Sequence, residues 1–459
     1  MSQELLNKTE IDVNDPELDC LLANLQANIL KYHGRRHAWH VFLAFSPGKT
    51  DTASEWIRRY AYRVTSAKTQ LKDTARRKKD LAYDGGTVIC FFMTKNGYQY
   101  FGYNPGNIGG GLVSMSESAA RLSDPPPETW QCMYRAEIHV MVLLADTNKH
   151  QLQKELDLIT LQTKDLLQAP PNVQKGESLH NPDGVSIEHF GYADGISQPR
   201  FLKEETTDGK LWNDNEALQM AIVEERIPNH KDCYGSFLVF RKLEQNVQLF
   251  REKTNELAGL LFPDHKDENA LKLAGAYVVG RFPNGTPVVK HPAEIPPQAD
   301  KKFDNDFDYS HDPRGAKCPY HSHTRITCPR DIRQGWLTRI VRRGIPYDEA
   351  GRNSDMQWHP EKGVGLLFMC YQSNIGKQFE RLQADWANAG EIQPTRQTAM
   401  DGLVGQGDNA RPQHWPSHWD GHNTVDSFRF SGAVTLKGGA YFFAPSLPFL
   451  RLMGPFATE

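Results

Sequence analysis

Short apolar runs alternate with longer amphipathic stretches along both halves of this 459-residue chain, and this alternation restricts the possible fold more than any other feature. The segment 140–145 is entirely apolar, which indicates a strand buried on both faces. Long polar stretches, such as 170–183, separate several of these elements, so the connections are not uniformly short crossovers. The pattern predicts an α+β fold in which helices pack on mainly antiparallel sheets, arranged as two similar halves.

The expected elements follow the same rhythm in each half. Strands are predicted over 39–45, 87–93, 137–145, 236–240, 277–281, 365–371 and 440–443. Helices are predicted over 16–33, 52–78, 147–167, 246–257 and 378–388, the first beginning at an Asp-Pro pair and ending before Gly34. The polar stretch 203–216 is the candidate boundary between the halves.

Charge and apolar run length exclude several broad classes of protein. The 53 Lys and Arg nearly balance the 56 Asp and Glu, giving a net charge of −3. This balance argues against a generally basic nucleic-acid binder and against an acidic solvating tail. The longest apolar runs are far shorter than the roughly 18 residues that a membrane-spanning helix needs. We therefore expect a globular protein that binds neither nucleic acid nor membrane.

The N-terminus and the cysteines together predict a cytoplasmic location. The first ten residues lack the basic and apolar segments of a secretory signal. Seven cysteines, an odd number, are scattered over the chain at positions 20, 90, 132, 233, 318, 328 and 370. This arrangement is a poor match to a disulfide framework and fits a reducing compartment.

The densest group of metal-binding residue types lies in segment 318–330, which carries Cys318, His321, His323 and Cys328. Structural zinc ligands usually come in pairs two to four residues apart, whereas the two histidines are separated by only one residue. Three interpretations remain open from this segment alone. It could be a zinc site, a loop with surface histidines, or a segment that presents one histidine to a haem iron.

Two further segments combine glycine with a charged side chain. Gly191 and Gly195 bracket Asp194, which predicts a tight turn that presents the carboxylate, although an ordinary Asp-Gly turn has the same pattern. Arg342 and Arg343 end a short predicted strand before Gly344. Such a pair is often a solvated strand edge, but one guanidinium could instead stabilise a peroxide-derived anion.

Taken in order, these three segments resemble the dye-decolourising peroxidase family of haem enzymes, in its longer bacterial form. The family's Gly-x-x-Asp-Gly motif is similar to 191–195, and its extension resembles 196–199. Its proximal-histidine segment resembles 318–330, which places the iron ligand at His323. Its distal arginine resembles Arg342, within 342–347. Weaker similarities to the opening helix, the strand along the distal pocket and the C-terminal segment lie at 25–30, 365–372 and 439–447.

The resemblance implies a fold, a cofactor and a site. The fold would consist of two ferredoxin-like halves, 1–215 and 216–459, with haem b held mainly by the second. Asp194 and Arg342 would be the catalytic residues and His323 the metal ligand. The residues expected to bind the cofactor are His323, Gly195, Ile196, Ser197, Arg330, Leu367, Phe368 and Asp401.

The implied activity is a haem peroxidase that reduces hydrogen peroxide and oxidises dyes and phenolic or other aromatic donors by one-electron steps. Asp194 would move the peroxide proton to the leaving oxygen, and Arg342 would stabilise the separating charge. A carboxylate behind His323 would raise the basicity of that ligand. Asp401 is the expected residue for that role, and Glu380 is its rival.

Other interpretations stay open at this stage. His321 competes with His323 as the iron ligand, and Arg343 competes with Arg342 as the distal arginine. A haem-binding or haem-handling protein without turnover would need His323 but neither Asp194 nor Arg342. A metal-dependent hydrolase using the Cys and His cluster is a third class. The sequence leaves the oligomeric state open.

Overall fold

A computed structural model describes residues 3–80, 83–109, 111–205, 209–225, 227, 232–264, 267–296, 303–330, 338–351, 359–391 and 398–454. One ten-stranded sheet forms its centre, with eight strands on the main path in the order β10-β11-β8-β14-β2-β3-β1-β4. Every pair of neighbours on this path is antiparallel. Two short strands, β7 (Val223–Glu224) and β9 (Val341–Arg342), pair with β8 and β11 beside the path.

The path divides into two groups of four strands that share one topology. The first group comprises β1 (His37–Leu43), β2 (Val88–Met93), β3 (Val140–Asp146) and β4 (Asn172–Glu177). The second comprises β8 (Tyr234–Gln245), β10 (Ile345–Asp348), β11 (Val364–Gln372) and β14 (Val434–Ala444). Numbered along the chain within each group, the spatial order is fourth, first, third, second. This is the ferredoxin-like arrangement, so the predicted α+β class with two ferredoxin-like sets of strands is confirmed.

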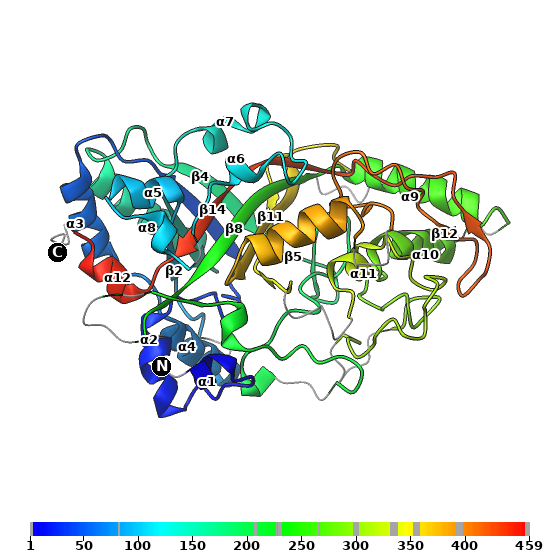
Figure 1. The fold of residues 1–459 in the computed structure, drawn as a ribbon, viewed down its shortest axis with the longest axis horizontal. Coiled ribbons are helices and arrows are strands. Elements are labelled where there is room, and N and C mark those ends of the chain that lie inside the picture. The colour runs from blue at the N-terminus through cyan, green and yellow to red at the C-terminus, as the bar shows by residue number, and fades with distance from the viewer. Residues whose placement is uncertain are drawn as a thin grey trace.

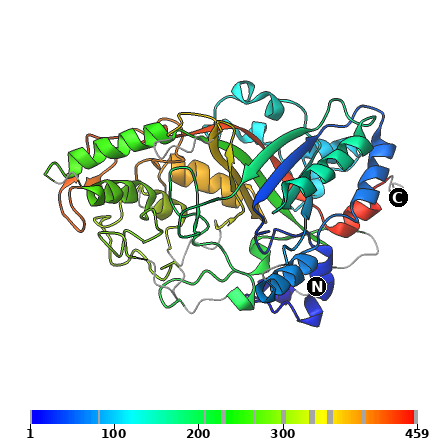
Figure 2. The same cartoon turned by 180° about the vertical axis from the view of Figure 1, so that it is seen from behind.

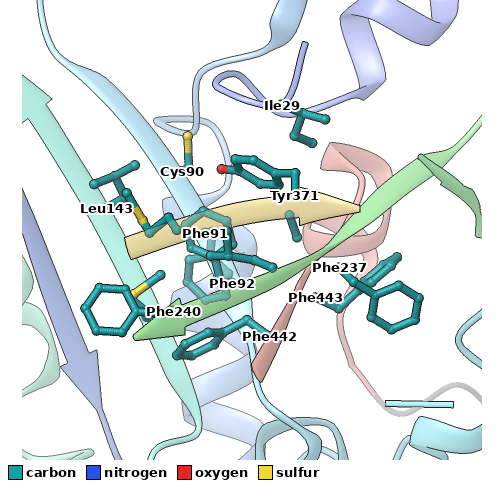
Figure 3. Close-up of a cluster of buried hydrophobic side chains, with 14 of the residues drawn as sticks. Ile29, Cys90, Phe91, Phe92, Leu143, Phe237, Phe240, Tyr371, Phe442 and Phe443 are labelled. Carbon is teal, nitrogen blue, oxygen red and sulfur yellow. The ribbon is translucent and has the colours of Figure 1, made fainter. Parts of the chain in front are cut away.

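The two groups meet where β14 lies beside β2, at the pairing of Phe443 with Met93. Figure 3 shows the buried apolar cluster at this junction, to which strands of both groups contribute side chains. Phe91 and Phe92 come from β2, and Phe442 and Phe443 come from β14. Burying aromatic side chains of this size supplies much of the hydrophobic free energy that joins two such units. The predicted domain boundary at 215/216 stays a prediction.

The two end strands of the path also approach each other. A Cβ atom placed on Gly176 of β4 would lie 2.6 Å from the Ile345 Cγ2 atom of β10 and 3.2 Å from the Pro346 carbonyl oxygen. Only a glycine allows this approach without displacing the neighbouring strand. The sheet therefore curls until β4 contacts β10.

Helices lie at both ends of the elongated molecule (Figures 1 and 2). At the end that holds both chain termini, α12 packs on α3; at the other end, α9 packs against α10. The α-helices are α1 (Gln3–Asn7), α2 (Asp19–Asn24), α3 (Thr50–Tyr60), α4 (Ala67–Lys79), α5 (Lys95–Tyr100), α6 (Met115–Ser118), α7 (Cys132–Arg135), α8 (Lys149–Thr163), α9 (Val247–Leu261), α10 (Glu268–Val279), α11 (His323–Thr327) and α12 (Leu447–Leu452).

A wider helix follows β11 and is formed by η6 (Gly376–Glu380) and η7 (Leu382–Asn388). The amide of Glu380 donates to the carbonyl oxygen of Ile375, and that of Ala389 donates to the carbonyl oxygen of Ala384. Both bonds span five residues, the spacing of a π-helix, which usually occurs as a single turn and often near functional sites. The predicted helix 378–388 is present in this widened form.

Several predicted elements differ from the structure. The expected strand 277–281 is the end of α10 and its cap, where Gly280 adopts a left-handed conformation with φ of 93°. A short continuous apolar run has the same pattern in a buried helix and a buried strand, so the prediction was wrong there. The expected helix 52–78 divides into α3 and α4, and β4 lies inside the expected loop 170–183.

The expected opening helix ends at Asn24, so segment 25–30 is not helical. The side chain of Gln26 explains this, because its Oε1 accepts the Phe91 amide and its Nε2 donates to the Phe91 and Pro445 carbonyl oxygens. Asn28 has a φ of 68°, which a continuing helix does not allow. In segment 25–30, hydrogen bonds to the sheet therefore take the place of the last turns of the expected helix.

Candidate active site

One large cavity is lined mainly by residues of the second half of the chain, with an empty volume of about 1750 Å³ that includes its opening to solvent. The strands β8 and β11, the widened helix and the helices α10 and α11 all contribute side chains to its wall. The loop 188–199 and strand β9 complete the lining. Asp194, His323, Arg330 and Arg342 all face this cavity, so the structure brings these four predicted residues together.

His323 is the first residue of α11, and its ring is oriented by Asp401. The imidazole Nδ1 lies 2.8 Å from Asp401 Oδ2. The other carboxylate oxygen, Oδ1, accepts the Leu403 amide at 2.8 Å and the Val404 amide at 3.1 Å. A carboxylate has only acceptor oxygens to offer, and Oδ1 already accepts two amides, so Nδ1 carries the proton of this contact and Nε2 is the ring nitrogen left for a metal.

The position of α11 is fixed by two buried side chains, one just before the helix and one on it. Ser322, just before the helix, donates its hydroxyl proton to the carbonyl oxygen of Tyr277 in α10. Arg325 forms a buried ion pair with Asp312 at 2.7 Å, and its guanidinium lies 4.5 Å from the centre of the Tyr309 ring. These contacts hold the backbone of His323 against α10 and the preceding loop. Asp312 is a residue that the sequence analysis did not single out.

Asp194 and Arg342 form an ion pair at the cavity wall. Arg342 Nη1 donates to Asp194 Oδ1 at 3.1 Å, and Nη2 donates to the Ile196 carbonyl oxygen at 2.7 Å. The Asp194 side chain is 31% exposed and the Arg342 side chain 34%, so both remain accessible to a small molecule in the cavity. Gly191 and Gly195 have φ angles of 92° and 81°, which explains the glycines on either side of the carboxylate.

Arg343 points away from the cavity, although it follows Arg342 directly. Its Nε donates to the Asn28 carbonyl oxygen at 2.9 Å and its Nη2 to the Ile29 carbonyl oxygen at 3.0 Å. Burial lowers the pKa of this guanidinium to about 10. Successive residues of a strand face opposite sides, so only one of the two arginines can line the cavity. Arg343 is therefore a structural residue of the junction with segment 25–30.

A second cationic group in the cavity consists of Arg281 and Arg330. Arg330 donates to Asn305 Oδ1 at 2.6 Å and to Ser197 Oγ at 3.0 Å, and Arg281 donates to the same Asn305 oxygen at 3.0 Å. Burial, reinforced by the neighbouring Arg330, lowers the pKa of Arg281 to about 10. Within the described ranges, neither guanidinium forms an ion pair with a carboxylate. Sequence analysis missed Arg281 because it assigned 277–281 to a strand.

The remaining predicted cofactor residues differ in their placement. Ile196 and Ser197 line the cavity, while Gly195 contributes its backbone turn. Leu367 does not line it: this side chain is fully buried in the main hydrophobic core, and Leu366 and Phe368 face the cavity instead. The expectation for Leu367 was wrong because neighbouring strand residues alternate between faces, so Leu367 and Phe368 cannot share a wall.

Glu380 and His321 do not occupy the alternative positions considered for them. Glu380 accepts hydrogen bonds from Arg121 Nη1 at 2.9 Å, from Tyr441 at 3.2 Å and from Ser118, while Asp401 is the partner of His323. His321 is buried outside the large cavity, and burial lowers its pKa to about 3. Across the described ranges, no three His, Cys, Asp or Glu side chains are grouped to hold a metal ion, so the zinc interpretation of 318–330 is not supported.

Glu188 is a partly buried carboxylate in the cavity wall that the sequence analysis also missed. Its two oxygens accept the backbone amides of Phe190 at 2.8 Å and Tyr192 at 2.9 Å, which closes the loop before Asp194. Gln245 of β8 also donates to it. Burial raises the pKa of Glu188 to about 7. The signal in the sequence that could have identified Glu188 is its position three residues before Gly191, the first residue of the Gly-x-x-Asp-Gly motif.

Comparison with known proteins places this site in a family. The family model described as Dyp-type peroxidase, C-terminal, matches residues 190–394. The multifunctional dye peroxidase DyP2 from Amycolatopsis sp. is 35% identical over 95% of this chain and 96% of its own length. The crystal structure of the DyP-type peroxidase from Anabaena sp. superposes with a TM-score of 0.90 at 36% identity, covering 99% of this chain and 100% of that one.

A third relative is more distant but covers most of the chain. The dye-decolorizing peroxidase msp1 of Mycetinis scorodonius is 30% identical over 73% of this chain and 70% of its own length. The solved structure of DyP2 has a TM-score of 0.86 and covers 97% of this chain. With this identity and coverage, the chain belongs to the dye-decolourising peroxidase family, whose members are haem b enzymes.

Proposed function

We propose that this protein uses hydrogen peroxide to oxidise dyes and other aromatic donors in the large cavity, with His323, Asp194 and Arg342 as its reactive side chains. The observation that carries the proposal is the convergence of an oriented histidine and an aspartate–arginine ion pair on one cavity. A protein that only stores or transfers haem would need the histidine but not the aspartate–arginine ion pair beside it. This favours a peroxidase with turnover.

The residues around the cavity fit haem b. His323 offers Nε2 to the iron, while Asp401 accepts the proton on Nδ1 and so raises the basicity of the ligand. Arg281 and Arg330 supply two buried positive charges that lack a carboxylate partner among the described residues, and this suits the two haem propionates. Phe368, Leu366 and Leu403 provide apolar surface for the porphyrin.

Haem supplies the redox chemistry of peroxide reduction. The chain's own residues move the proton and stabilise charge. Asp194 accepts the proton of the peroxide oxygen that binds and returns it to the oxygen that leaves, so that water departs in place of hydroxide. Arg342 donates to this carboxylate and directs a fixed positive charge to the same place, where the separating oxygen becomes negative.

The donors and the compartment are the less specific parts of the proposal. Names of the relatives refer to dyes, which supports dyes and similar aromatic molecules as the electron donors here. All seven cysteines lie in the described residues and none is in a disulfide, which supports a reducing cytoplasm. Within the described residues, no helix has both the length and the apolar character needed to cross a membrane.

The test is an absorption spectrum of the haem-loaded protein before and after one equivalent of peroxide, followed by addition of an aromatic dye. We expect a Soret band, a spectral change within seconds of adding peroxide, and loss of dye colour as the first spectrum returns. A Soret band that does not respond to peroxide would contradict turnover and favour a haem-handling protein.

A further inference from the structure

The turn that carries Asp401 is attached to the end of the widened helix. The amide of Asp401 donates to the carbonyl oxygen of Ala387 at 2.9 Å. Ala387 lies in the last turn of η7, where carbonyl groups have no partner within the helix. A Cβ atom on Gly405 would lie only 2.9 Å from the same carbonyl oxygen, so turn and helix end are in close contact. The helix therefore supports the backbone behind the carboxylate that orients His323.

The side chain of Gln383 fastens the other end of this turn. Its Nε2 donates to the carbonyl oxygen of Val404 at 2.7 Å. The N–H of the same peptide group, that of Gly405, donates to the Asp401 carbonyl oxygen at 3.1 Å. On its other side, the Val404 amide donates to Asp401 Oδ1 at 3.1 Å. Gln383 thus holds the peptide group on which the backbone and the side chain of Asp401 both depend.

The widening of the helix places Gln383 for this contact. Gln383 Nε2 also donates to Asn388 Oδ1 at 2.9 Å, across five positions of the chain. Side chains on one face of an α-helix are three or four residues apart, whereas the i→i+5 bonding of a π-helix brings residues five apart together. Asn388 Oδ1 also accepts the Gln406 amide at 2.9 Å, and its Nδ2 donates to the Leu122 carbonyl oxygen at 2.7 Å. These partners determine the orientation of both side-chain amides.

Gln383 can act on the haem site only through the position of other groups. The residue is 5% exposed, lines the large cavity and carries no charge. The helix segment η7, to which it belongs, packs against α11, the helix that begins at His323. Exchanging Gln383 for an apolar residue leaves the net charge of the site unchanged. An effect on the iron would therefore report how firmly Asp401 is held.

We propose that Gln383 is a positioning residue for the haem ligand: it fixes the turn of Asp401 and so keeps this carboxylate in hydrogen-bonding contact with His323 Nδ1. The inference rests on the proposed role of His323 as the iron ligand. A carboxylate that accepts the Nδ1 proton raises the basicity of the imidazole and strengthens its bond to iron. Without Gln383 the turn is less constrained, and this contact weakens.

The test is the iron–histidine stretching frequency in the resonance Raman spectrum of the ferrous, haem-loaded protein, measured together with the Fe(III)/Fe(II) midpoint potential. Gln383→Leu removes the donor to the Val404 carbonyl oxygen without adding charge. We expect the stretching frequency to fall and the potential to become more positive. Both shifts should have the direction of those in Asp401→Asn and should be smaller. Haem affinity should fall by no more than about tenfold, the lower end of the range for residues that support metal ligands.

Gln378→Leu is the matched control. Gln378 belongs to the same widened helix, is 4% exposed, and its Nε2 donates to the carbonyl oxygens of Met220 and Arg339, which lie outside the turn of Asp401. This variant should lose stability without a shift in frequency or potential. Should Gln383→Leu fail to fold, Asn388→Leu removes the second acceptor of the Gln383 amide and should shift both quantities in the same direction.

The outcomes separate this inference from the assignment of the iron ligand. A shift in Asp401→Asn with none in Gln383→Leu would overturn the inference and leave His323 as the ligand. A shift in Gln378→Leu as large as in Gln383→Leu would also overturn it, because the effect would then come from general loosening of the helix. If Asp401→Asn itself shifts neither quantity, the proposed role of His323 fails and the inference fails with it.

Discussion

His323 Nδ1 donates to Asp401 Oδ2 across 2.8 Å, and the two residues are 78 positions apart in the chain. The carboxylate is completely buried, while its second oxygen is occupied by two backbone amides. This fixes both the ring orientation and the tautomer of His323. The ring nitrogen that remains, Nε2, is the one suited to iron.

The identity of the iron ligand can be tested by exchanging each histidine of segment 318–330 for alanine. His323→Ala should lose most of its bound haem, because His323 lines the large cavity. His321→Ala should keep its haem, because that side chain is buried outside the large cavity. Haem content per polypeptide, measured by the pyridine haemochrome method, distinguishes the two. Normal haem content in His323→Ala would contradict the assignment.

A second prediction concerns the partner of the ligand. Asp401→Asn keeps the size of the side chain but removes the negative charge behind His323, so the imidazole becomes a weaker electron donor to iron. We expect the Fe(III)/Fe(II) midpoint potential to become more positive and haem affinity or activity to fall about 10–100-fold. Spectroelectrochemical titration measures the potential.

Glu380→Gln is the control for that prediction. Glu380 is also a buried carboxylate, but its partners are Ser118, Arg121 and Tyr441. It should lower stability without shifting the potential. A shift in Glu380→Gln as large as in Asp401→Asn would mean that general burial of charge, and not the contact with His323, sets the potential.

A third prediction separates the roles of Asp194 and Arg342 by chemical rescue. Removing a positioned acid–base group typically costs about 10²–10⁴-fold in rate, and removing one electrostatic donor about 10²–10³-fold. These ranges overlap, so the size of the loss cannot identify a role. Added formate should restore part of the peroxide reaction of Asp194→Ala, whereas added guanidinium should restore part of that of Arg342→Ala.

Stopped-flow absorbance at the Soret band follows the rescue directly. Each additive is also tested on the other variant, where it should have no effect beyond that of ionic strength. Rescue of both variants by guanidinium and of neither by formate would show that Asp194 only holds Arg342 in place through their 3.1 Å contact.

The sequence predicted which residues gather around the cavity better than it predicted the structure around them. Asp194, His323 and Arg342 lie in local motifs whose glycines and spacing are visible in the chain, and the cavity contains all three. The topology was also predictable as a class, because strand and helix alternate in both halves. What remained ambiguous is set by contacts between distant segments. For example, the hydrogen bonds of Arg343 to carbonyl oxygens of segment 25–30 distinguish it from Arg342, and the sequence does not show these bonds.

The alternation of side chains between the two faces of a strand explains the error at Leu367. Leu367 and Phe368 are equivalent in an apolar run, and only the register of β11 against β8 and β10 decides which of them faces the cavity. Arg281 was missed for a related reason. Its segment is apolar enough for either a strand or a buried helix, and the position of the arginine just after the end of α10 becomes visible only in the fold.

A fourth prediction concerns stability in acid. Burial lowers the pKa of His33 to about 3 and that of His40 to about 4, from the usual value of 6.5. Between pH 6.5 and these values the unfolded chain binds more protons than the folded one, so the free energy of unfolding must fall as the pH falls. Each unit of pKa difference corresponds to about 1.4 kcal/mol, and we expect a total loss of several kcal/mol between pH 6.5 and 4.

Urea denaturation of the haem-loaded protein at several pH values measures this loss. His40→Gln removes one of the buried histidines with a lowered pKa and should give a shallower dependence on pH, whatever its effect at neutral pH. His150→Gln, at an exposed position of α8, should leave the slope unchanged. A slope in His40→Gln equal to that of the unaltered protein would contradict the prediction.

The last prediction uses Arg342 and Arg343 as a matched pair, because these adjacent arginines, at the end of β9 and just after it, have different partners. Arg343→Met leaves the Asn28, Ile29 and Arg342 carbonyl oxygens without their guanidinium donor. Each buried acceptor left unpaired costs about 1–3 kcal/mol, so we expect the free energy of unfolding to fall by about 3 kcal/mol or more. The rate of the peroxide reaction should stay within about threefold of the original, since the cavity is not altered.

Arg342→Met should do the reverse. Its side chain is 34% exposed, and its loss should cost about 1 kcal/mol of stability but about 10²–10³-fold in the peroxide reaction. Urea denaturation and stopped-flow kinetics on both variants give the two quantities. The opposite pattern, in which Arg343→Met abolishes the reaction while remaining stable, would show that Arg343 is the distal arginine and would require the strand β9 to lie one residue out of the register described here.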